Sequence, residues 1–460
     1  MSSTSMPDAS SKLPVAVVGG GLAGLAAAWK LKSLGVPAVG FEASARLGGL
    51  IQTERWEDSV YEHGPDGFLL RRPQAKELCD ALGVPLQPLS PLPQNIYIAS
   101  RRGIFPLPKG LGLLVPTDWL SFFTSPLLSP LGRLRLALEP WLGKRPPTSS
   151  VTDESLASFI RRRFGREAYE TLAEPLLGGV WNTDPEILSL RASFPHYADL
   201  EQSAGSVLRG LGRSQALPVE GGGLASPVGG MGTLIEALEQ ACGGIWQTRA
   251  RVRSIQKLPQ GFWLDLGSGQ GSAVRGVLLA LPPRAASELV QDLSNRAGSL
   301  LSDIPSGGIG TLSMTLRAED FYRPLDAWGV LFTKSSGSLI DGFQWSSSKW
   351  GHRSGADRVV VRAFFGGFKN PGFLDADNVV DAALEALRPW LKASARPLHT
   401  AIRRWQTAFP QIKVGHLERL GEVEALLPPE ISLAGQGYRG VGMPAVIASA
   451  FLAAQKWAAI

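Results

Sequence analysis

The segment Gly19-x-Gly21-x-x-Gly24 constrains the fold of this chain more than any other part of the sequence. It follows Pro14 to Val18, a short apolar run typical of a buried parallel strand, and it opens the alanine-rich stretch Leu25 to Leu31, which favours a helix. A second apolar run, Pro37 to Phe41, ends at Glu42. The chain is therefore expected to begin with a complete βαβ unit.

Each glycine of this segment has its own role in binding a dinucleotide. Gly19 permits a tight turn, Gly21 lets the backbone approach a pyrophosphate, and Gly24 lets the helix pack on the strand. The helix N-terminus supplies backbone N–H groups for phosphate, and Glu42 is the expected acceptor for ribose hydroxyls, which disfavours NADP. A glycine-rich turn without a ligand is the alternative. The predicted contacts here are Gly19, Gly21, Leu22, Ala23, Gly24, Glu42 and Ala43.

Composition limits the other chemistry that the chain can carry. Cys79 and Cys242 are its only cysteines and lie far apart, which excludes a zinc ribbon, an iron–sulfur cluster and a disulfide framework. The five histidines are never three or four residues apart, so no local metal site is predicted. Any redox chemistry therefore requires a bound organic cofactor. The net charge of +6 over 460 residues is too weak to predict a nucleic-acid partner.

The sequence carries no pattern for export or membrane insertion. Residues 1–13 are polar and rich in serine, and we expect a short disordered segment rather than a signal or transit peptide. No run of about 18 apolar residues occurs, so no membrane-spanning helix is predicted. We expect a protein that is cytoplasmic, or peripheral on the cytoplasmic or stromal face of a membrane, and not secreted.

Two further segments place glycine where the backbone must run close to a large cofactor. Arg46-Leu47-Gly48-Gly49 follows the ribose acid, and Gly64-Pro65-Asp66 comes soon after it. Together with the first glycine segment they resemble the FAD-dependent amine oxidase and phytoene desaturase superfamily. The resemblance implies a Rossmann-type domain that binds FAD noncovalently, since no Cys or His lies in an obvious flavin-linking motif. It also implies cofactor contacts at Arg46, Gly48, Gly49, Gly64, Pro65 and Asp66.

The end of the chain narrows the resemblance to one family. Residues 434–449 read Ala-Gly-Gln-Gly-Tyr-Arg-Gly-Val-Gly-Met-Pro-Ala-Val-Ile-Ala-Ser and resemble the closing flavin motif of the oxygen-dependent, FAD-containing protoporphyrinogen oxidases. Segments 159–165, 174–180 and 184–195 resemble the same family. The resemblance extends over nearly the whole chain, from Val15 to Ala454.

A physical argument supports a flavin contact at this closing segment. A predicted strand over Ile431–Leu433, a glycine-rich turn and a helix that starts near Pro444 would place backbone N–H groups toward flavin oxygens. An ordinary strand-to-helix corner is the alternative. The family resemblance implies an adenine contact at Val252, in a predicted strand over Arg251–Ile255. The flavin contacts that it implies are Gly435, Val441, Gly442 and Met443.

The resemblance also implies the reaction: a porphyrinogen loses six electrons to become a porphyrin, and three O2 are reduced to three H2O2. The flavin carries this chemistry, so no catalytic side chain and no metal is predicted. Leu331, Gln344 and Phe364 match strand positions that contact the macrocycle in the family, although Gln344 replaces an aliphatic residue of plant sequences. Plain core packing is the alternative for each of the three.

One departure from the family concerns the substrate carboxylate. Mitochondrial-type relatives have a propionate-binding arginine where this chain has Ile96. Arg101, with Arg102 beside it, could bind the propionate in place of that arginine. The alternative is that both residues lie in a solvated β-turn and bind no substrate. The choice between protoporphyrinogen IX and coproporphyrinogen III is therefore left open.

The predicted fold class is α/β: a discontinuous Rossmann-type FAD-binding domain, a mixed-sheet substrate domain and a helical membrane-associating domain. The apolar segment 105–131, flanked by Arg133, Arg135 and Lys144, suits an interfacial surface that faces anionic lipid, and a buried helical subdomain or a homodimer contact are its alternatives. A polyamine or amino-acid oxidase and a non-catalytic flavin-fold protein are the alternative functions. The predicted domains are FAD binding over 14–90, 205–285 and 425–460, helical over 91–204, and substrate binding over 286–424.

Overall fold

The computed structural model describes residues 13–70, 72–93, 96–112, 115–143, 153–213 and 223–458. Residues 1–12, for which disorder is predicted, lie outside the described residues, as do Leu113 and Leu114 of the apolar segment and the basic Lys144.

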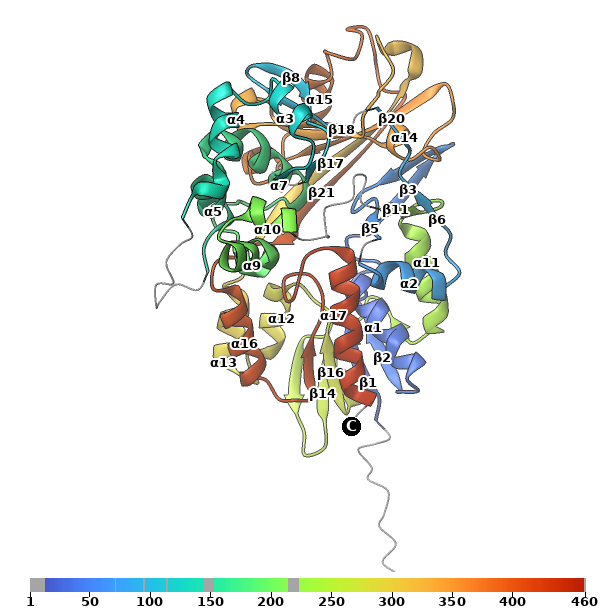
Figure 1. Cartoon of the computed structure of the whole chain (residues 1–460). Coiled ribbons are helices and arrows are strands. Elements are labelled where there is room, and N and C mark those ends of the chain that lie inside the picture. The colour runs from blue at the N-terminus through green and yellow to red at the C-terminus, as the bar shows by residue number, and fades with distance from the viewer. Residues whose placement is uncertain are drawn as a thin grey trace, which may run out of the picture.

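A five-stranded sheet, parallel throughout, forms the lower part of the molecule (Figure 1). The predicted βαβ unit at the start of the chain is confirmed. All three segments predicted to bind FAD supply strands to this sheet, and the boundaries of those segments stay a prediction. The strands, in spatial order, are β12 (Trp246–Gln247), β2 (Ala38–Phe41), β1 (Val15–Val18), β16 (Gly276–Leu279) and β22 (Ile431–Leu433).

Both faces of this sheet are covered, which explains why its strands are apolar without alternation. One hydrophobic core lies between the sheet and three helices, α1 (Leu22–Ser33), α11 (Gly232–Cys242) and α17 (Met443–Gln455). A second core lies on the opposite face. Its elements are β13 (Ser254–Lys257), β14 (Phe262–Gly267), β15 (Gln270–Val274), α12 (Pro283–Val290), α13 (Asn295–Ser302) and α16 (His416–Leu426).

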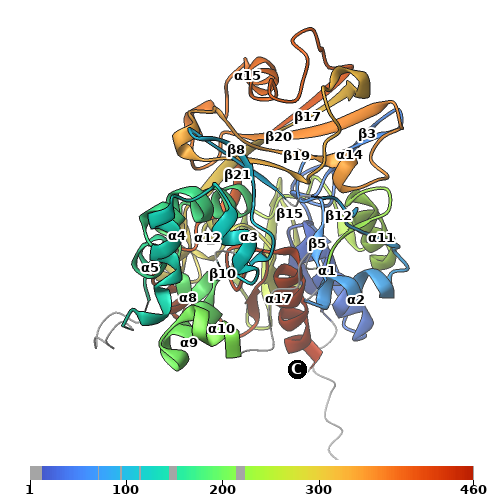
Figure 2. The same ribbon diagram turned by 45° about the horizontal axis from the view of Figure 1, so that its top comes forward.

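A seven-stranded mixed sheet forms the upper part of the molecule (Figure 2). Its strands pair antiparallel except β18 with β7, and α15 (Val379–Ala386) covers its outer face. In order they are β21 (His399–Pro410), β17 (Ser306–Arg317), β20 (Arg358–Phe365), β19 (Ile340–Trp345), β18 (Gly329–Phe332), β7 (Tyr97–Ser100) and β8 (Gly103–Pro106). Apolar or alternating runs over 311–316, 329–332 and 358–365 predict strands from the sequence, and β17, β18 and β20 confirm them. Strands β7 and β8 come from the segment predicted to be helical.

A helical part lies beside the five-stranded sheet and below the inner face of the seven-stranded one (Figures 1 and 2). Its core contains a fully buried ion pair between Arg163 and Glu139, and the Ser206 hydroxyl also donates to the Glu139 carboxylate at 2.5 Å. The π-helical turn η3 (Tyr169–Ala173) precedes α7. The helices are α3 (Trp119–Thr124), α4 (Pro130–Ala137), α5 (Leu156–Phe164), α6 (Arg166–Ala168), α7 (Glu174–Trp181), α8 (Leu190–Ser193), α9 (Pro195–Ala204) and α10 (Val207–Arg213). Among the described residues, no helix is both long and apolar enough to cross a membrane.

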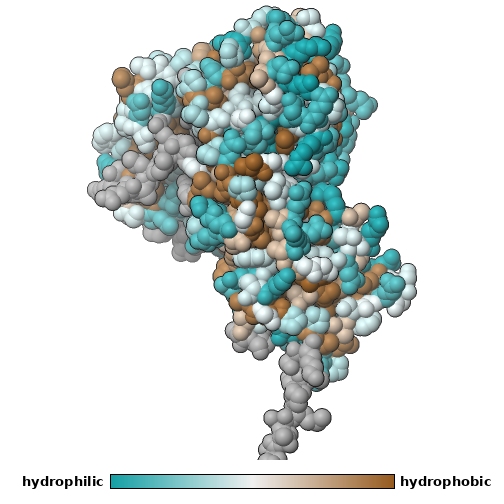
Figure 3. Space-filling model, turned by 90° about the vertical axis from the view of Figure 1, so that its right-hand side faces the viewer, coloured by the Kyte–Doolittle hydropathy of each residue, from teal (hydrophilic) through white to brown (hydrophobic). Residues whose placement is uncertain are grey.

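Smaller elements join the two sheets on the side of the molecule seen in Figure 3, where hydrophilic residues cover most of the upper part and hydrophobic residues gather near the middle. A buried ion pair between Glu62 and Arg353, with 2.8 Å between Oε1 and Nη1, connects this region to the segment before β20. The elements are β3 (Thr53–Trp56), β4 (Ser59–Glu62), β5 (Phe68–Leu69), α2 (Gln74–Ala81), β6 (Leu86–Pro88), β11 (Leu224–Pro227) and α14 (Ser346–Lys349). The short pair β9 (Leu111–Gly112) and β10 (Val115–Pro116) instead packs with the helical part.

Candidate active site

The N-terminus of α1 faces open space at the carboxyl end of β1. Gly19 has a φ of +103°, and a Cβ on Gly24 would lie 1.8 Å from the Gly19 carbonyl oxygen, so both positions require glycine. A Cβ on Gly21 would meet only the Gly49 Cα, at 3.9 Å, and no side chain caps the helix at this residue. The backbone here is thus open to a ligand, and the helix dipole favours an anionic one.

Glu42 is held beside this turn by two backbone groups. The Gly20 N–H donates to Oε2 and the Ser44 N–H donates to Oε1, both at 2.7 Å. A carboxylate has about four acceptor positions, so it retains capacity for hydroxyl donors. The Ala250 N–H donates to the Glu42 carbonyl at 2.9 Å, which brings the segment containing Val252 alongside. The predicted strand over Arg251–Ile255 is wrong at its start, because β13 begins at Ser254 and the buried Val252 precedes it.

The second glycine turn packs directly on the first. The Gly48 N–H donates to the Gly20 carbonyl at 2.8 Å, and a Cβ on Gly49 would lie 3.1 Å from the Gly21 Cα. Arg46 closes the turn, because its guanidinium donates to the carbonyls of Leu47 and Ile51 at 3.1 Å and of Gly49 at 2.5 Å. Burial lowers the pKa of Arg46, and Arg403 adds to that effect. The structure therefore shows Arg46 organising the turn, a role that its place in the sequence does not reveal.

The third turn, Gly64-Pro65-Asp66, is held in place by side chains at the C-terminus of α14. A Cβ on Gly64 would lie 1.9 Å from the Leu50 carbonyl oxygen, so glycine is required. Asp66 accepts hydrogen bonds from Trp350 Nε1 at 2.6 Å and Lys349 Nζ at 3.0 Å. Burial acts to raise the pKa of the Asp66 carboxyl, but the cationic neighbours outweigh it and hold that pKa well below its usual range. Asp66 is thus an ionised anchor of this turn.

The closing glycine segment meets the first turn at the same edge of the sheet. A Cβ on Gly435, which has a φ of +118°, would lie 3.3 Å from the Ala23 Cβ. Helix α17 begins after Gly442 and, like α1, has no side-chain cap. Val441 packs against the helical core and Met443 against the core beneath α1. Two uncapped helix N-termini therefore belong to one region of the molecule.

The inner face of the seven-stranded sheet carries the predicted substrate contacts in one place. Leu331 on β18 pairs with Gly342 on β19, which pairs with Phe364 on β20. Ile98 on β7 adjoins Leu331, so these residues form an apolar row along the sheet. Gln344 lies two residues beyond Gly342 on β19, so its side chain is on the same face of the sheet. The structure thus brings Leu331, Gln344 and Phe364 together, and the Leu331 side chain lies over Gly342, where an added Cβ would be 2.9 Å from Leu331 Cδ2.

Arg362 lies on this face beside Gln344 and is not predicted from the sequence. It pairs in register with Gln344 on one side and with Ser313 on the other, and its Nη2 donates to the Gly64 carbonyl at 2.6 Å. Burial lowers the pKa of its guanidinium to about 10, so it is protonated at neutral pH. Its two-residue spacing from Phe364 is the one sequence signal that could have identified it, because alternate residues of a strand share a face.

Arg101 lies away from this row. It occupies the turn between β7 and β8, is exposed, and donates from Nε to the Ser335 carbonyl at 2.9 Å. Arg102 beside it pairs with Glu167 at 3.1 Å, and Ile96 packs against the helical core. The propionate contact predicted at Arg101 stays a prediction.

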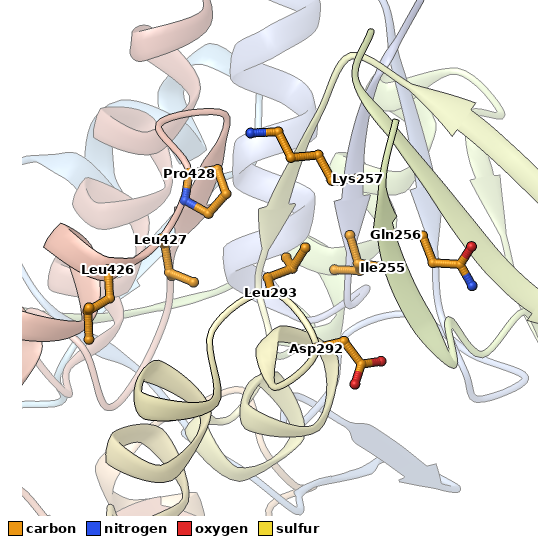
Figure 4. Close-up of a pocket in the computed structure, with 8 residues that line it drawn as sticks. All are labelled: Ile255, Gln256, Lys257, Asp292, Leu293, Leu426, Leu427 and Pro428. Carbon is orange, nitrogen blue, oxygen red and sulfur yellow. The ribbon is translucent and has the colours of Figure 1, made fainter. Parts of the chain in front are cut away.

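A surface groove of about 540 Å³ lies elsewhere, between β13, the α12–α13 connection and the end of α16 (Figure 4). None of the predicted site residues lines it. Its charged groups are Lys257 and Asp292, whereas leucine side chains line much of the remainder. The groove is therefore separate from the glycine turns and the apolar row.

Comparison with known proteins decides the family. The model of the family described as "Flavin containing amine oxidoreductase" matches residues 22–456. This chain belongs to that family. FAD is accordingly its cofactor, and the three glycine turns and the two uncapped helix N-termini fit a dinucleotide with a second ring system. Among the described residues, no group of three His, Cys, Asp or Glu side chains could hold a metal ion.

Individual relatives are similar over nearly their full lengths. Coproporphyrinogen III oxidase of Bacillus subtilis is 29% identical over 94% of this chain and 95% of the relative, and protoporphyrinogen oxidase 2 of Arabidopsis thaliana is 27% identical over 90% and 88%. A crystal structure from Exiguobacterium sp. 255-15, named "Putative protoporphyrinogen oxidase", is 27% identical with a TM-score of 0.81 and covers 97% of this chain and 98% of that one. Putrescine oxidase has a TM-score of 0.70 at 18% identity, a likeness that shows the fold alone.

Proposed function

We propose that this protein is a FAD-dependent oxidase that converts protoporphyrinogen IX to protoporphyrin IX in haem or chlorophyll biosynthesis. The porphyrinogen loses six electrons and six protons, which reduce three O2 to three H2O2. The observation that carries the proposal is the apolar row of Ile98, Leu331 and Phe364 on the inner face of the upper sheet, in a chain whose relatives are named as porphyrinogen oxidases.

The row suits a flat apolar ring. From β18 to β20 it spans two strand spacings, about 10 Å. Gly342 between them adds no side chain of its own and Leu331 covers it, so Leu331 and the Phe364 ring could present one apolar surface to a planar macrocycle. Burying the macrocycle against these residues would also exclude water from the reacting carbon.

The cofactor contacts follow from the same arrangement. The α1 N-terminus and the turn at 19–24 would hold the pyrophosphate. Glu42 would accept hydrogen bonds from the ribose hydroxyls, and the segment with Val252 would contact the adenine. The α17 N-terminus at Gly442 would donate backbone N–H groups to the flavin ring. Bound FAD supplies the hydride acceptor and the transfer of electrons to O2. The chain's own residues position the macrocycle and keep it dry.

Flavin reduction tests this proposal. The purified protein should be yellow, and protoporphyrinogen IX added without oxygen should bleach it. Putrescine, added under the same conditions, serves as the comparison. Bleaching by the amine alone would contradict the proposal in favour of an amine oxidase, and a flavin that no substrate bleaches would indicate a structural cofactor.

Coproporphyrinogen III is the second candidate substrate. It is favoured by relatives from Bacillus subtilis and Staphylococcus aureus, both named coproporphyrinogen III oxidase, at 29% and 28% identity. The rate of anaerobic flavin bleaching, measured at equal concentrations of the two porphyrinogens, ranks them directly.

An exposed apolar surface on the helical part suggests peripheral contact with a membrane. It is formed by α3, α4 and the turn after α4, and its side chains are 39% to 78% exposed. Sedimentation with anionic vesicles tests the proposal, and Trp141→Asp should weaken the binding. A stable dimer that dissociates in the same variant would instead show that a second copy of the chain covers this surface. The residues are Trp119, Leu120, Phe123, Leu131, Leu134, Leu138 and Trp141.

A further inference from the structure

Arg362 is a buried arginine that lacks a carboxylate partner. Its side chain is 3% exposed, and no Asp or Glu oxygen of the described residues lies within 4.0 Å of its guanidinium. The other deeply buried arginines are paired, Arg163 with Glu139 and Arg353 with Glu62. Asp66 and Glu62 favour its charge from beyond that distance, but their direct partners are Lys349 and Arg353. Since a buried charge without a direct partner is costly, Arg362 is available to an anionic partner from outside the chain.

Several buried polar atoms at and around Arg362 have no hydrogen-bond partner within the described residues. Nη2 donates to the Gly64 carbonyl, but Nε, although buried, has no hydrogen-bond acceptor. The hydroxyls of Ser313 and Thr311 on β17 are buried and unpartnered as well. Ser313 is the register partner of Arg362, and Thr311 is that of Phe364, so the three groups share one face of two adjacent strands. Such a concentration of unsatisfied donors indicates a ligand with acceptor oxygens.

Arg362 adjoins the apolar row proposed to bind the macrocycle. Its guanidinium lies 4.7 Å from the centre of the Phe364 ring, and Gln344 on β19 is its register partner. A ring that lies on Leu331 and Phe364 would therefore bring a substituent of its rim to this guanidinium. The planar fork of arginine matches the two oxygens of a carboxylate.

Arg362 lies at the same level of the sheet as Ile96, the position at which the family resemblance implies an arginine. Ile96 precedes Tyr97, the register partner of Val330, so it falls beside Gly329, which pairs with Gln344. Ile96 and Arg362 are therefore at the same level of the sheet, three strand spacings or about 14 Å apart. Ile96 on the β7 side and Arg362 on β20 therefore lie at opposite ends of one level of the sheet, on the same side of the apolar row.

We propose that Arg362 binds a carboxylate of the substrate, with the hydroxyls of Ser313 and Thr311 as further donors. This inference rests on the proposed function, because it assumes a macrocycle that carries carboxylates at its rim. No bond is made or broken in this contact. Arg362 acts by orienting the ring over the inner face.

The test compares a carboxylate-bearing porphyrin with its ester in the FAD-loaded protein. Protoporphyrin IX and its dimethyl ester, in the same detergent, are titrated against the wild type, Arg362→Met and Arg362→Lys, with the Soret band as the readout. Arg358→Met is the matched control, because Arg358 lies on the same strand and face but is already paired with Glu57 and Asp58. Far-UV circular dichroism, FAD content and the flavin midpoint potential are recorded for each variant.

Arg362→Met should weaken binding of the acid by about ten- to hundredfold and leave binding of the ester unchanged. Arg362→Lys should have a smaller effect in the same direction, and Arg358→Met none. An acid-to-ester affinity ratio that is unchanged in Arg362→Met overturns the inference, and a shift in flavin potential with that ratio unchanged assigns Arg362 to the cofactor instead. If Arg362→Met does not fold or retain FAD, an unchanged ratio in Arg362→Lys is the refuting result. A wild type that binds neither compound refutes the proposed function itself.

Discussion

Gly21 is the position at which cofactor binding can be separated from folding. Its backbone has φ −73° and ψ −177°, a region open to every residue type, and an added Cβ would have one neighbour, 3.9 Å away. Gly21→Ala should therefore leave the free energy of unfolding of the apoprotein unchanged or raise it by up to about 1 kcal/mol, because alanine restricts the unfolded chain.

The same methyl group should obstruct FAD. It projects into the space beside the uncapped N-terminus of α1, where the pyrophosphate is expected to approach. Moving a phosphate away from one backbone N–H costs about 1.5–3 kcal/mol, since the acceptor is charged. Affinity for FAD should then fall about ten- to hundredfold in Gly21→Ala. The larger Gly21→Val should emerge from gel filtration without FAD.

Gly24→Ala provides the matched control, because its methyl group would lie 1.8 Å from the Gly19 carbonyl oxygen and must force the helix from the strand. We expect it to lower the free energy of unfolding of the apoprotein by about 1–3 kcal/mol or more. Urea denaturation of the apoproteins and FAD titration by fluorescence measure the two effects separately. A Gly21→Val protein that retains stoichiometric FAD, or a Gly24→Ala apoprotein as stable as the wild type, would refute this reasoning.

Three further predictions concern the neighbouring groups. Burial opposes ionisation of Asp66, but its cationic neighbours hold its pKa below the usual 3.8; Asp66 should therefore stabilise the fold above about pH 4, and the stability difference from Asp66→Asn should shrink as pH falls below that value in urea denaturation. Arg353→Met leaves the buried Glu62 carboxylate unpaired and should lower the free energy of unfolding by about 3–5 kcal/mol, measured in the same way; a loss under 1 kcal/mol would contradict the pairing. Phe364→Ala should weaken binding of the porphyrin ester by about 1 kcal/mol, or fivefold, in a Soret titration, whereas unchanged binding would indicate that Phe364 only packs the core.

The features predicted well from the sequence are those whose determining residues lie close together along the chain. The turn at 19–24, the strand before it and the helix after it lie within about twenty consecutive residues, and each glycine has a separate steric reason. The same holds for the closing turn at 435–442 and the helix after it. The strand pattern around 311–316 and 358–365 is also local, because it depends on runs of apolar residues.

The features that the sequence did not predict depend on pairing between distant segments. The short β7–β8 hairpin lies in a region rich in proline and leucine, and it joins the upper sheet only because β18, more than 200 residues later, offers it a free edge. Arg46 donates its hydrogen bonds to backbone carbonyls of its own turn, and Asp66 accepts hydrogen bonds from the side chains of Lys349 and Trp350. Their positions in glycine motifs do not show these contacts.

By itself the sequence predicted a dinucleotide-binding βαβ unit, because glycine is required at fixed places within a short stretch of chain, and its motifs resembled those of FAD-containing oxidases. Only the tertiary structure decided which residues lie next to one another on the inner face of the upper sheet. Leu331, Gly342 and Phe364 become one row, and Arg362 and Ser313 become neighbours, through the register of four strands. A shift of one residue in any of them would turn that strand's side chains to the other face, and no local pattern specifies such a register.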